Sequence, residues 1–228
     1  MTRFYSDFET YSEANLRKCG TDRYARDPST EVLMYAYAFD NEPVQQWVPA
    51  EGEKMPKDVR DALRDPDVIK SAWNAPIEIN ILKHVLNEDI YINEWRCSMA
   101  LAATLSLPLS LGKCGEVLGV EQDKRKDSRG KALIRKFCMP LKPTKRRKYT
   151  KATWVTDPDE WEEFKAYNIQ DVEAERANVR KMLRYDLPEH EWELWFLDQK
   201  INQRGIPINL AAIDNAVAAV EHLSLIHI

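Results

Sequence analysis

Alternation of apolar and polar residues dominates the first hundred positions of the chain and predicts β-strands. The segment RFYSDFETYS (3–12) is rich in aromatic and β-forming residues, so we expect an opening strand there. Two apolar runs, 31–40 and 43–48, predict a pair of strands joined by a tight turn around Asn41 and Glu42. Further strands are expected at 67–73, at the start of 95–107, and at IPIN (206–209).

Elsewhere, apolar residues recur three and four positions apart, which is the spacing of helices with one buried face. The segment 74–86 follows this pattern just after an expected strand. The longest predicted helix runs from Pro158 to about Arg184, with Thr156 or Asp157 as its N-cap. Other helices are expected at 57–65, the second part of 95–107, 110–120, 128–138, 187–205 and from Leu210 onward.

Strands early in the chain and helices later indicate an α/β domain built on a mixed sheet, which we place at residues 1–186. With 44% hydrophobic residues among 228, the chain can bury a sizeable core. The segment 141–153 has no periodicity and is expected to be a mobile loop. Residues 187–222 form an expected helical connector. No apolar run approaches the length of a membrane span and no signal segment precedes the first strand, so no membrane association is expected.

Charge is unevenly distributed along the chain. The net charge of −4 does not by itself favour a nucleic-acid partner, yet 124–151 is rich in Lys and Arg whereas 157–175 is acidic. A basic surface beside an acidic pocket suits a polyanion held through metal ions. A solvated basic loop is the alternative that charge alone leaves open. The cysteines are scattered without a C-x-x-C pair, which favours reduced thiols over zinc or disulfides: Cys19, Cys97, Cys114 and Cys138.

Two acids interrupt the opening strand one residue apart. Successive side chains of a strand alternate between its faces, so Asp7 and Glu9 point together while Phe8 points the other way. Two like charges side by side are unfavourable unless a cation lies between them, and a divalent metal ion is the usual candidate. Taken alone, the pair also fits two unrelated surface acids at a strand end.

Two further fragments supply partners for this pair. Glu78 lies four residues after Asn74, where an expected strand gives way to a helix. Tyr167 and Asp171 are four residues apart in the longest predicted helix and therefore share one of its faces. Each fragment also has a plain structural explanation: a first-turn acid favoured by the helix dipole, a helix-capping Asn74, and a rim aromatic beside a surface acid.

The order of these fragments, D-x-E, then N-x3-E, then Y-x3-D, resembles the three motifs of the DEDD exonuclease superfamily in its tyrosine subclass. A histidine-type member would carry its base at position 166, which is Ala166 here. Longer blocks, including DFETYSEANLRKCGTDRYARDPSTEVLMYAYAFD and YNIQDVEAE, resemble the N-terminal part of phage-type family A DNA polymerases over roughly residues 3–210. The resemblance implies a ribonuclease H-like α/β fold.

The resemblance also implies two-metal hydrolysis of the 3′-terminal phosphodiester of DNA, releasing nucleoside 5′-monophosphates. Two Mg²⁺ or Mn²⁺ ions about 3.5–4 Å apart would neutralise the attacking and leaving oxygens. By resemblance, Asp7 bridges both ions, Glu9 and Asp171 complete the site that activates water, and Glu78 holds the second ion. The Tyr167 hydroxyl, with an ordinary pKa near 10, would orient the water. The family more often has Asp where this chain has Glu78; an outer or water-mediated ligand tolerates the added methylene.

Substrate contacts are implied at the motif residues and in the basic loop. They are Asn74, Thr10, Lys142, Lys145, Arg146 and Arg147. Trp73, Trp95 and Trp154 are candidates for stacking on bases, although large aromatic residues in such a domain more often belong to the core. The expected partner is a single-stranded or frayed 3′ end, bound by a monomer in the cytoplasm of a bacterial host that carries the phage or prophage.

The last six residues, LSLIHI (223–228), match a possible translation of a transposon-derived sequencing adapter. We therefore expect a gene truncated before its polymerase domain, with a non-native tail and no nucleotide-adding activity. Alternatively, these residues naturally extend an apolar helix face. Two other functions compete with proofreading: a free-standing exoribonuclease, and a non-catalytic nucleic-acid-binding or scaffolding domain that has lost its metal ions.

Overall fold

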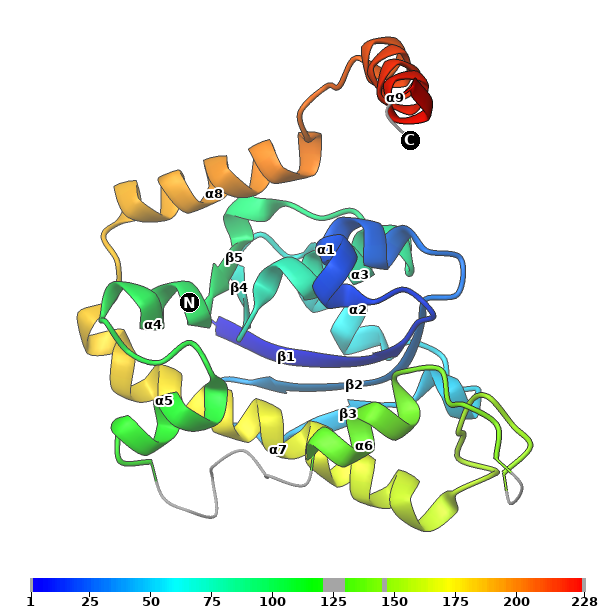
Figure 1. Cartoon of the computed structure of the whole chain (residues 1–228). Coiled ribbons are helices and arrows are strands. Elements are labelled where there is room, and N and C mark those ends of the chain that lie inside the picture. Colours follow the sequence, from blue (N-terminus) through cyan, green and yellow to red (C-terminus); the bar gives the residue numbers. More distant parts are fainter. Residues whose placement is uncertain (1, 121–129, 145–146, 227–228) are drawn as a thin grey trace.

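One five-stranded mixed sheet forms the centre of the computed structural model, which describes residues 2–120, 130–144 and 147–226 (Figure 1). The strand order is β3-β2-β1-β4-β5. β1 is antiparallel to β2 and parallel to β4, β2 is antiparallel to β3, and β4 is parallel to β5. The strands are β1 (Thr2–Tyr11), β2 (Glu31–Phe39), β3 (Gln45–Trp47), β4 (Val68–Ala72) and β5 (Trp95–Cys97). The predicted α/β class with a mixed sheet is confirmed.

Helices cover both faces of the sheet. α1, α2 and α3 pack on the face that carries Phe4 and Phe8 of β1. α5, α6 and α7 pack on the opposite face, against residues such as Tyr5 and Met34. The α-helices are α1 (Leu16–Arg26), α2 (Lys57–Arg64), α3 (Ala75–His84), α4 (Ser98–Thr104), α5 (Leu111–Val117), α6 (Gly130–Phe137), α7 (Pro158–Met182), α8 (Glu189–Arg204) and α9 (Leu210–Ile226). Short 3₁₀ turns are η1 (Pro49–Glu51), η2 (Ile92–Glu94) and η4 (Leu183–Tyr185).

The register of β1 determines how the acids are presented. Phe8 faces α1–α3, where its ring stacks on Tyr35 with centroids 4.0 Å apart. Asp7 and Glu9 therefore point to the face covered by α7. The pairing of β1 with β2 shifts between Glu9 and Thr10, which is a bulge directly beside the second acid. Bulges re-aim side chains near functional sites.

Two expectations about secondary structure need correction, and one helix was not predicted. IPIN (206–209) is not a strand; it connects α8 to α9 as irregular chain. The helix α1 was not predicted, because its apolar residues are few and Gly20 breaks it with φ 77°. Asp157 occupies the N-cap position of α7, but its side chain makes no capping hydrogen bond. It instead accepts hydrogen bonds from Tyr149 and Thr156 and pairs with Lys136.

The last two helices differ in how they pack. α8 buries Trp192 and Phe196, and the Arg96 guanidinium lies 5.1 Å from the centroid of each ring. The side chains of α9 are exposed from Leu210 to Ser224. Among the helices that the structure describes, none combines the length and apolar character needed to cross a membrane.

Candidate metal centre

Three carboxylates converge between β1 and α7. Asp7 and Glu9 come from β1 and Asp171 from α7, and one oxygen of each lies within 4.8 Å of the others. Glu9 and Asp171 are buried, and Asp7 is partly exposed. Three acids at this spacing repel one another unless a cation lies between them, and carboxylate oxygens are the ligands that Mg²⁺ and Mn²⁺ prefer. The donor set therefore fits a hard divalent ion.

Glu78 lies near this group but outside the set of three. It is in the first turn of α3, which begins just after β4, and β4 runs parallel to β1. Glu78 is 4% exposed, and its Oε2 is buried without a hydrogen-bond partner among the residues that the structure describes. Burial, and then the charge of Asp7, raise the pKa of Glu78 well above its ordinary value. A metal ion, or a water molecule bound to one, would satisfy this buried carboxylate oxygen beside Asp7.

Tyr167 is buried one helical turn before Asp171. Its ring stacks on Phe164 with the centroids 6.2 Å apart. Burial is the largest cause that raises the pKa of the Tyr167 hydroxyl above 10, followed by the charges of Asp171, Glu9 and Asp7. The ordinary pKa expected from the sequence is therefore an underestimate, and the phenol stays protonated at any physiological pH. A protonated hydroxyl donates a hydrogen bond and does not act as a base.

Gly130 makes room for the Tyr167 ring. A Cβ at position 130, the first residue of α6, would lie 1.9 Å from Cε2 and 2.3 Å from Cζ of Tyr167. Real Cβ contacts are essentially never shorter than 3.0 Å. Any other residue would therefore displace either α6 or the ring, so the position of the phenol depends on this glycine.

Asn168, which the sequence analysis did not identify, holds Asp7 in place. The Asn168 Nδ2 donates to the Asp7 carbonyl at 3.1 Å and to Asp7 Oδ2 at 3.0 Å. Its Oδ1 accepts from Gln46 Nε2, which also donates to the Lys165 carbonyl. Since a carbonyl can only accept, Gln46 must present its amide nitrogen there, and this fixes the orientation of Asn168 as a donor to Asp7.

Cys138 contacts the second acid of the pair. Its thiol donates to Glu9 Oε2 at 3.5 Å from a buried position. Burial and then the Glu9 charge raise the pKa of this thiol well above 9, so it remains a neutral donor. All four cysteines are free thiols, and only Cys19 is not buried.

The predicted substrate residues lie in different surroundings. The Thr10 hydroxyl is buried and shares a hydrogen bond with Tyr24 Oη at 2.9 Å. Asn74 precedes α3 at the N-cap position, but its side chain makes no capping hydrogen bond, so the capping role is wrong. Arg147 donates to the Lys142 carbonyl at 3.0 Å, which places these two cations together in the loop before α7. Lys145 and Arg146 lie outside the described residues.

The three tryptophans considered as base-stacking residues differ in how exposed their side chains are. Trp95 is 1% exposed and belongs to the core, as expected. Trp73 is partly buried, and its Nε1 donates to the Leu109 carbonyl at 2.9 Å. Trp154 is 44% exposed, and its Nε1 donates to the Ala50 carbonyl at 3.1 Å. Only Trp154 of these three has a substantially exposed indole.

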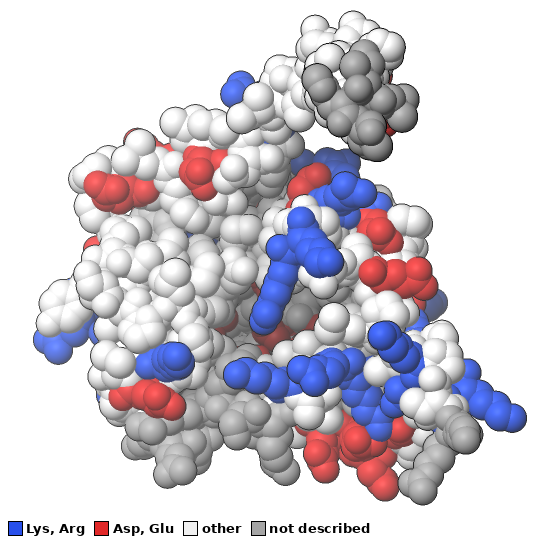
Figure 2. All heavy atoms as spheres, viewed as in Figure 1, with Lys and Arg blue, Asp and Glu red and all other residues white. Residues whose placement is uncertain are grey.

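The surface around the carboxylates is hollowed and bordered by positive charge. Figure 2 shows acidic side chains at the bottom of a hollow near the centre of this face, with Lys and Arg side chains over α1 on one side and over α6 on the other. A bound polyanion would meet cations at the border and carboxylates at the base. That arrangement is compatible with a nucleic acid only if cations also bind at the base.

Comparison with known proteins gives two similarities. The chain is 40% identical over 216 residues to the DNA polymerase of Bacillus phage SP02, which covers 94% of this chain and 33% of that protein. The chain therefore spans about one third of the length of this curated relative. A solved structure of a nuclease in its apo form aligns with TM-score 0.52 and 15% identity, covering 89% of this chain and 85% of that chain. This likeness agrees with the expected ribonuclease H-like fold. No family model matches the chain.

Proposed function

We propose that this chain is a 3′→5′ exonuclease domain, of the tyrosine DEDD subclass, that belongs to a phage DNA polymerase of family A. It would remove mismatched nucleotides from the single-stranded or frayed 3′ end of DNA. The observation that carries the proposal is the convergence of Asp7, Glu9 and Asp171, with Tyr167 buried one helical turn before Asp171. Similarity to a phage DNA polymerase supplies the substrate class and the expected partner, a polymerase domain.

In this proposal, Asp7, Glu9 and Asp171 would hold two Mg²⁺ or Mn²⁺ ions together with Glu78. The ions would supply the charge that stabilises the attacking and leaving oxygens of the phosphodiester. Asn168 keeps the Asp7 carboxylate in one orientation, and the Cys138 thiol does the same for Glu9. The Tyr167 hydroxyl would donate a hydrogen bond to the attacking water and so orient it. The products would be nucleoside 5′-monophosphates, released by a monomer in the host cytoplasm.

The first test compares wild type with Asp7→Ala on single-stranded DNA in Mg²⁺ or Mn²⁺. A 3′-labelled strand should release labelled mononucleotide at once, and a 5′-labelled strand should shorten stepwise. We expect Asp7→Ala to reduce the rate by more than about 100-fold, because loss of even an outer partner of a metal ligand costs 10- to 100-fold. The matched control is Asp159→Asn, an exposed acid of the same helix as Asp171.

The proposal fails if a protein with native circular dichroism releases no nucleotide in either metal. It also fails if Asp7→Ala and Asp159→Asn degrade DNA at the same rate.

A further inference from the structure

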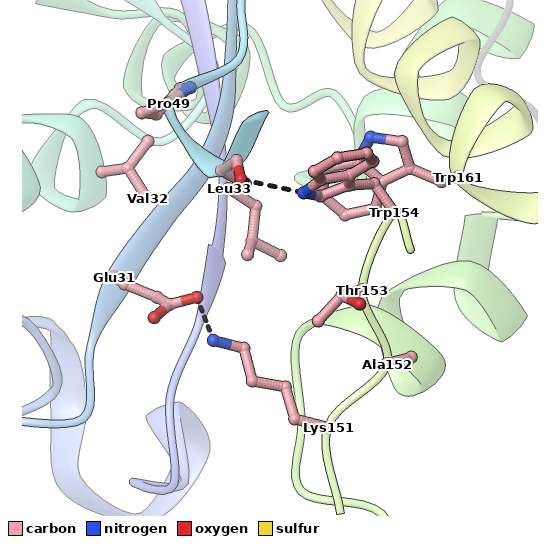
Figure 3. Close-up of a pocket in the computed structure, with 10 residues that line it drawn as sticks. Glu31, Val32, Leu33, Pro49, Lys151, Ala152, Thr153, Trp154 and Trp161 are labelled. Atoms are coloured by element: carbon pink, nitrogen blue, oxygen red, sulfur yellow. Dashed lines mark hydrogen bonds and ion pairs between the residues drawn. The ribbon is translucent and has the colours of Figure 1, made fainter. Parts of the chain in front are cut away.

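A cavity of about 380 Å³ opens beside the N-terminal end of β2 (Figure 3), and its lining does not include Asp7, Glu9 or Asp171. Its walls come from β2, η1, the segment before α7, and α7 itself. The lining residues are Glu31, Val32, Leu33, Pro49, Ala50, Lys151, Ala152, Thr153, Trp154 and Trp161. This volume is within the range of sites that bind small molecules, roughly 300–1,000 Å³.

The cavity has flat apolar walls. In Figure 3 the indoles of Trp154 and Trp161 lie across from Leu33. Both indoles are anchored, because Trp154 Nε1 donates to the Ala50 carbonyl and Trp161 Nε1 donates to Glu51 Oε1 at 2.7 Å. Trp161 is buried, whereas Trp154 is 44% exposed. An indole that is held by its nitrogen and left open on its surface can stack on a planar ring.

The cavity also has a polar edge. β3 pairs with β2 only over Tyr35–Tyr37. The part of β2 that lines the cavity, Glu31–Leu33, is therefore not paired with β3. Backbone N–H and C=O groups alternate along such an edge and can serve as donors and acceptors. Flat apolar walls combined with a hydrogen-bonding edge match a heterocyclic base, which has apolar faces and a polar rim.

Lys151 lines this cavity and also contacts Tyr11 of β1, the strand that carries Asp7 and Glu9. Its ammonium is 4.6 Å from the centroid of the Tyr11 ring and pairs with Glu31 at the mouth of the cavity. Tyr11 follows Glu9 by two residues on β1, roughly 7 Å along the strand, and is directly opposite Glu31 of β2. An ammonium has three donors, so the pair with Glu31 leaves donors for a phosphate. The cavity is therefore reachable by a strand whose 3′ end lies on the carboxylates.

We propose that this cavity binds a base of the single strand, upstream of the nucleotide that is removed, by stacking on Trp154 with a phosphate near Lys151. The inference rests on the proposed exonuclease function for its ligand. It assigns a role to Trp154 and distinguishes it from Trp73 and Trp95.

The test measures cleavage of a dinucleotide and a hexanucleotide by wild type, Trp154→Ala and Trp154→Phe. With the stacked base two or more nucleotides upstream of the one removed, a dinucleotide leaves the cavity empty. We expect Trp154→Ala to raise KM for the hexanucleotide by roughly 5- to 150-fold, the range for loss of one stacking aromatic side chain. The dinucleotide rate and kcat should stay unchanged, and Trp154→Phe should recover most of the loss. Tyr185→Ala, at an exposed aromatic residue 62% accessible, is the matched control.

Equal kinetics of Trp154→Ala and wild type on both lengths would overturn the proposal, as would an equal loss on both lengths. Should the wild type cleave nothing, the proposed function fails and the cavity is tested by binding alone. Hexanucleotides with 2-aminopurine at successive positions would then be quenched by wild type at one position and not by Trp154→Ala. Absence of such quenching in the folded protein would overturn the cavity proposal independently.

Discussion

Asp7 is held at two atoms by a single neighbour. Because Asn168 bonds both its backbone carbonyl and its carboxylate, rotation about the side-chain bonds of Asp7 breaks a hydrogen bond. Asn168 is 0% exposed and is itself fixed by Gln46. Metal ligands oriented in this way bind ions more tightly than free carboxylates, since less side-chain entropy is lost on binding.

We predict that Asn168→Ala weakens Mn²⁺ binding by about 10- to 100-fold, the usual effect of losing an outer partner of a ligand. The measurement is a titration of free Mn²⁺ by electron paramagnetic resonance, without DNA. The matched control is Asn178→Ala, which removes another buried α7 asparagine whose Nδ2 donates to the Leu111 carbonyl at 3.0 Å. Equal Mn²⁺ affinity of the two variants would show that Asn168 supports the fold and not the ligand.

The substitution Gly130→Ala tests whether this glycine determines the position of the Tyr167 ring. Gly130→Ala should destabilise the protein by about 1–3 kcal/mol, as overpacking does, and should reduce nuclease activity because the Tyr167 ring must move. Gly115→Ala is the comparison, since its Cβ would meet only the end of the Asn178 side chain at 3.0 Å. Urea unfolding and nucleotide release measure the two effects. Wild-type behaviour of Gly130→Ala would mean that α6 shifts without strain.

The acids of the candidate site stand out in the sequence, whereas the residues that support them do not. Asp7, Glu9, Glu78 and Asp171 stand in short spacings that identify them in the chain. The hydrogen bond between Asn168 and Asp7 joins residues 161 apart, and the one between Gln46 and Asn168 joins residues 122 apart. Local patterns contain no information about which distant side chain will lie within hydrogen-bonding distance.

At the scale of elements, α7 connects the site to the far end of the sheet. Tyr167 and Asp171 face Asp7 and Glu9 of β1, and one turn later Glu175 is buried against Ser71 and Ser98. The next residue, Arg176, donates to the carbonyls of Asp40 and Glu42 in the turn between β2 and β3. One helix thus fixes both the acids and the turn, so a shift of α7 would move them together.

Glu175 should make stability depend on pH. Its Oε1 accepts from Ser98 Oγ at 2.5 Å, and burial is the largest cause that raises the pKa of this carboxyl to about 8. Hydrogen bonds from Ser98 and Ser71 and the Arg3 charge lower this pKa, whereas the Asp7 charge raises it. The folded protein therefore binds the proton more tightly than the unfolded chain, whose ordinary value is 4.5. Stability from this group is complete below pH 4.5 and is lost as the pH rises to about 8.

We predict that Glu175→Gln flattens the decrease in unfolding free energy between about pH 5 and 8 and makes the protein more stable than wild type at about pH 9. Urea unfolding in the presence of a chelator measures this. Glu163→Gln, on the exposed face of the same helix, should leave the wild-type slope intact. If Glu175→Gln keeps that slope, another group carries the pH dependence.

The elements with strong periodicity were predicted, and the failures have physical causes. β1, β2, β4, α3 and α7 lie where the patterns place them. α1 was missed because its two short helical parts meet at Gly20 and bury only Tyr24 and Ala25. IPIN has the composition of a strand, yet a strand exists only with a hydrogen-bonded neighbour, which composition cannot supply. The boundaries at residues 186 and 222 stay predictions.

At the scale of the whole molecule, the distribution of charge suits a DNA strand that is attracted by cations at the border of the hollow and bound at its bottom. Lys142 and Arg147 are adjacent in the loop before α7, whereas the acids lie inward on β1 and α7. Each phosphate that a cation neutralises releases counterions, so affinity should fall with salt.

We predict that Lys142→Gln with Arg147→Gln weakens binding of single-stranded DNA and makes it less sensitive to salt. The slope of log affinity against log salt should become shallower by about 0.7 for each phosphate that these two cations neutralise in the wild type. Fluorescence anisotropy at several salt concentrations gives the slope. Lys57→Gln, at an exposed cation of α2, should leave it unchanged. A slope that matches wild type in the double variant would exclude these two cations from the DNA path.

The separation of the ligands along the chain also decides when the centre can exist during synthesis. Asn168, which holds Asp7, is made 161 residues after it. At roughly 5–20 residues per second, translation needs on the order of 8–30 s to cover that distance. Until α7 has left the ribosome and docked on β1, Asp171 is kept away from Asp7 and Glu9. If the proposed activity is correct, the messenger RNA and any DNA nearby meet no assembled hydrolytic centre during that interval.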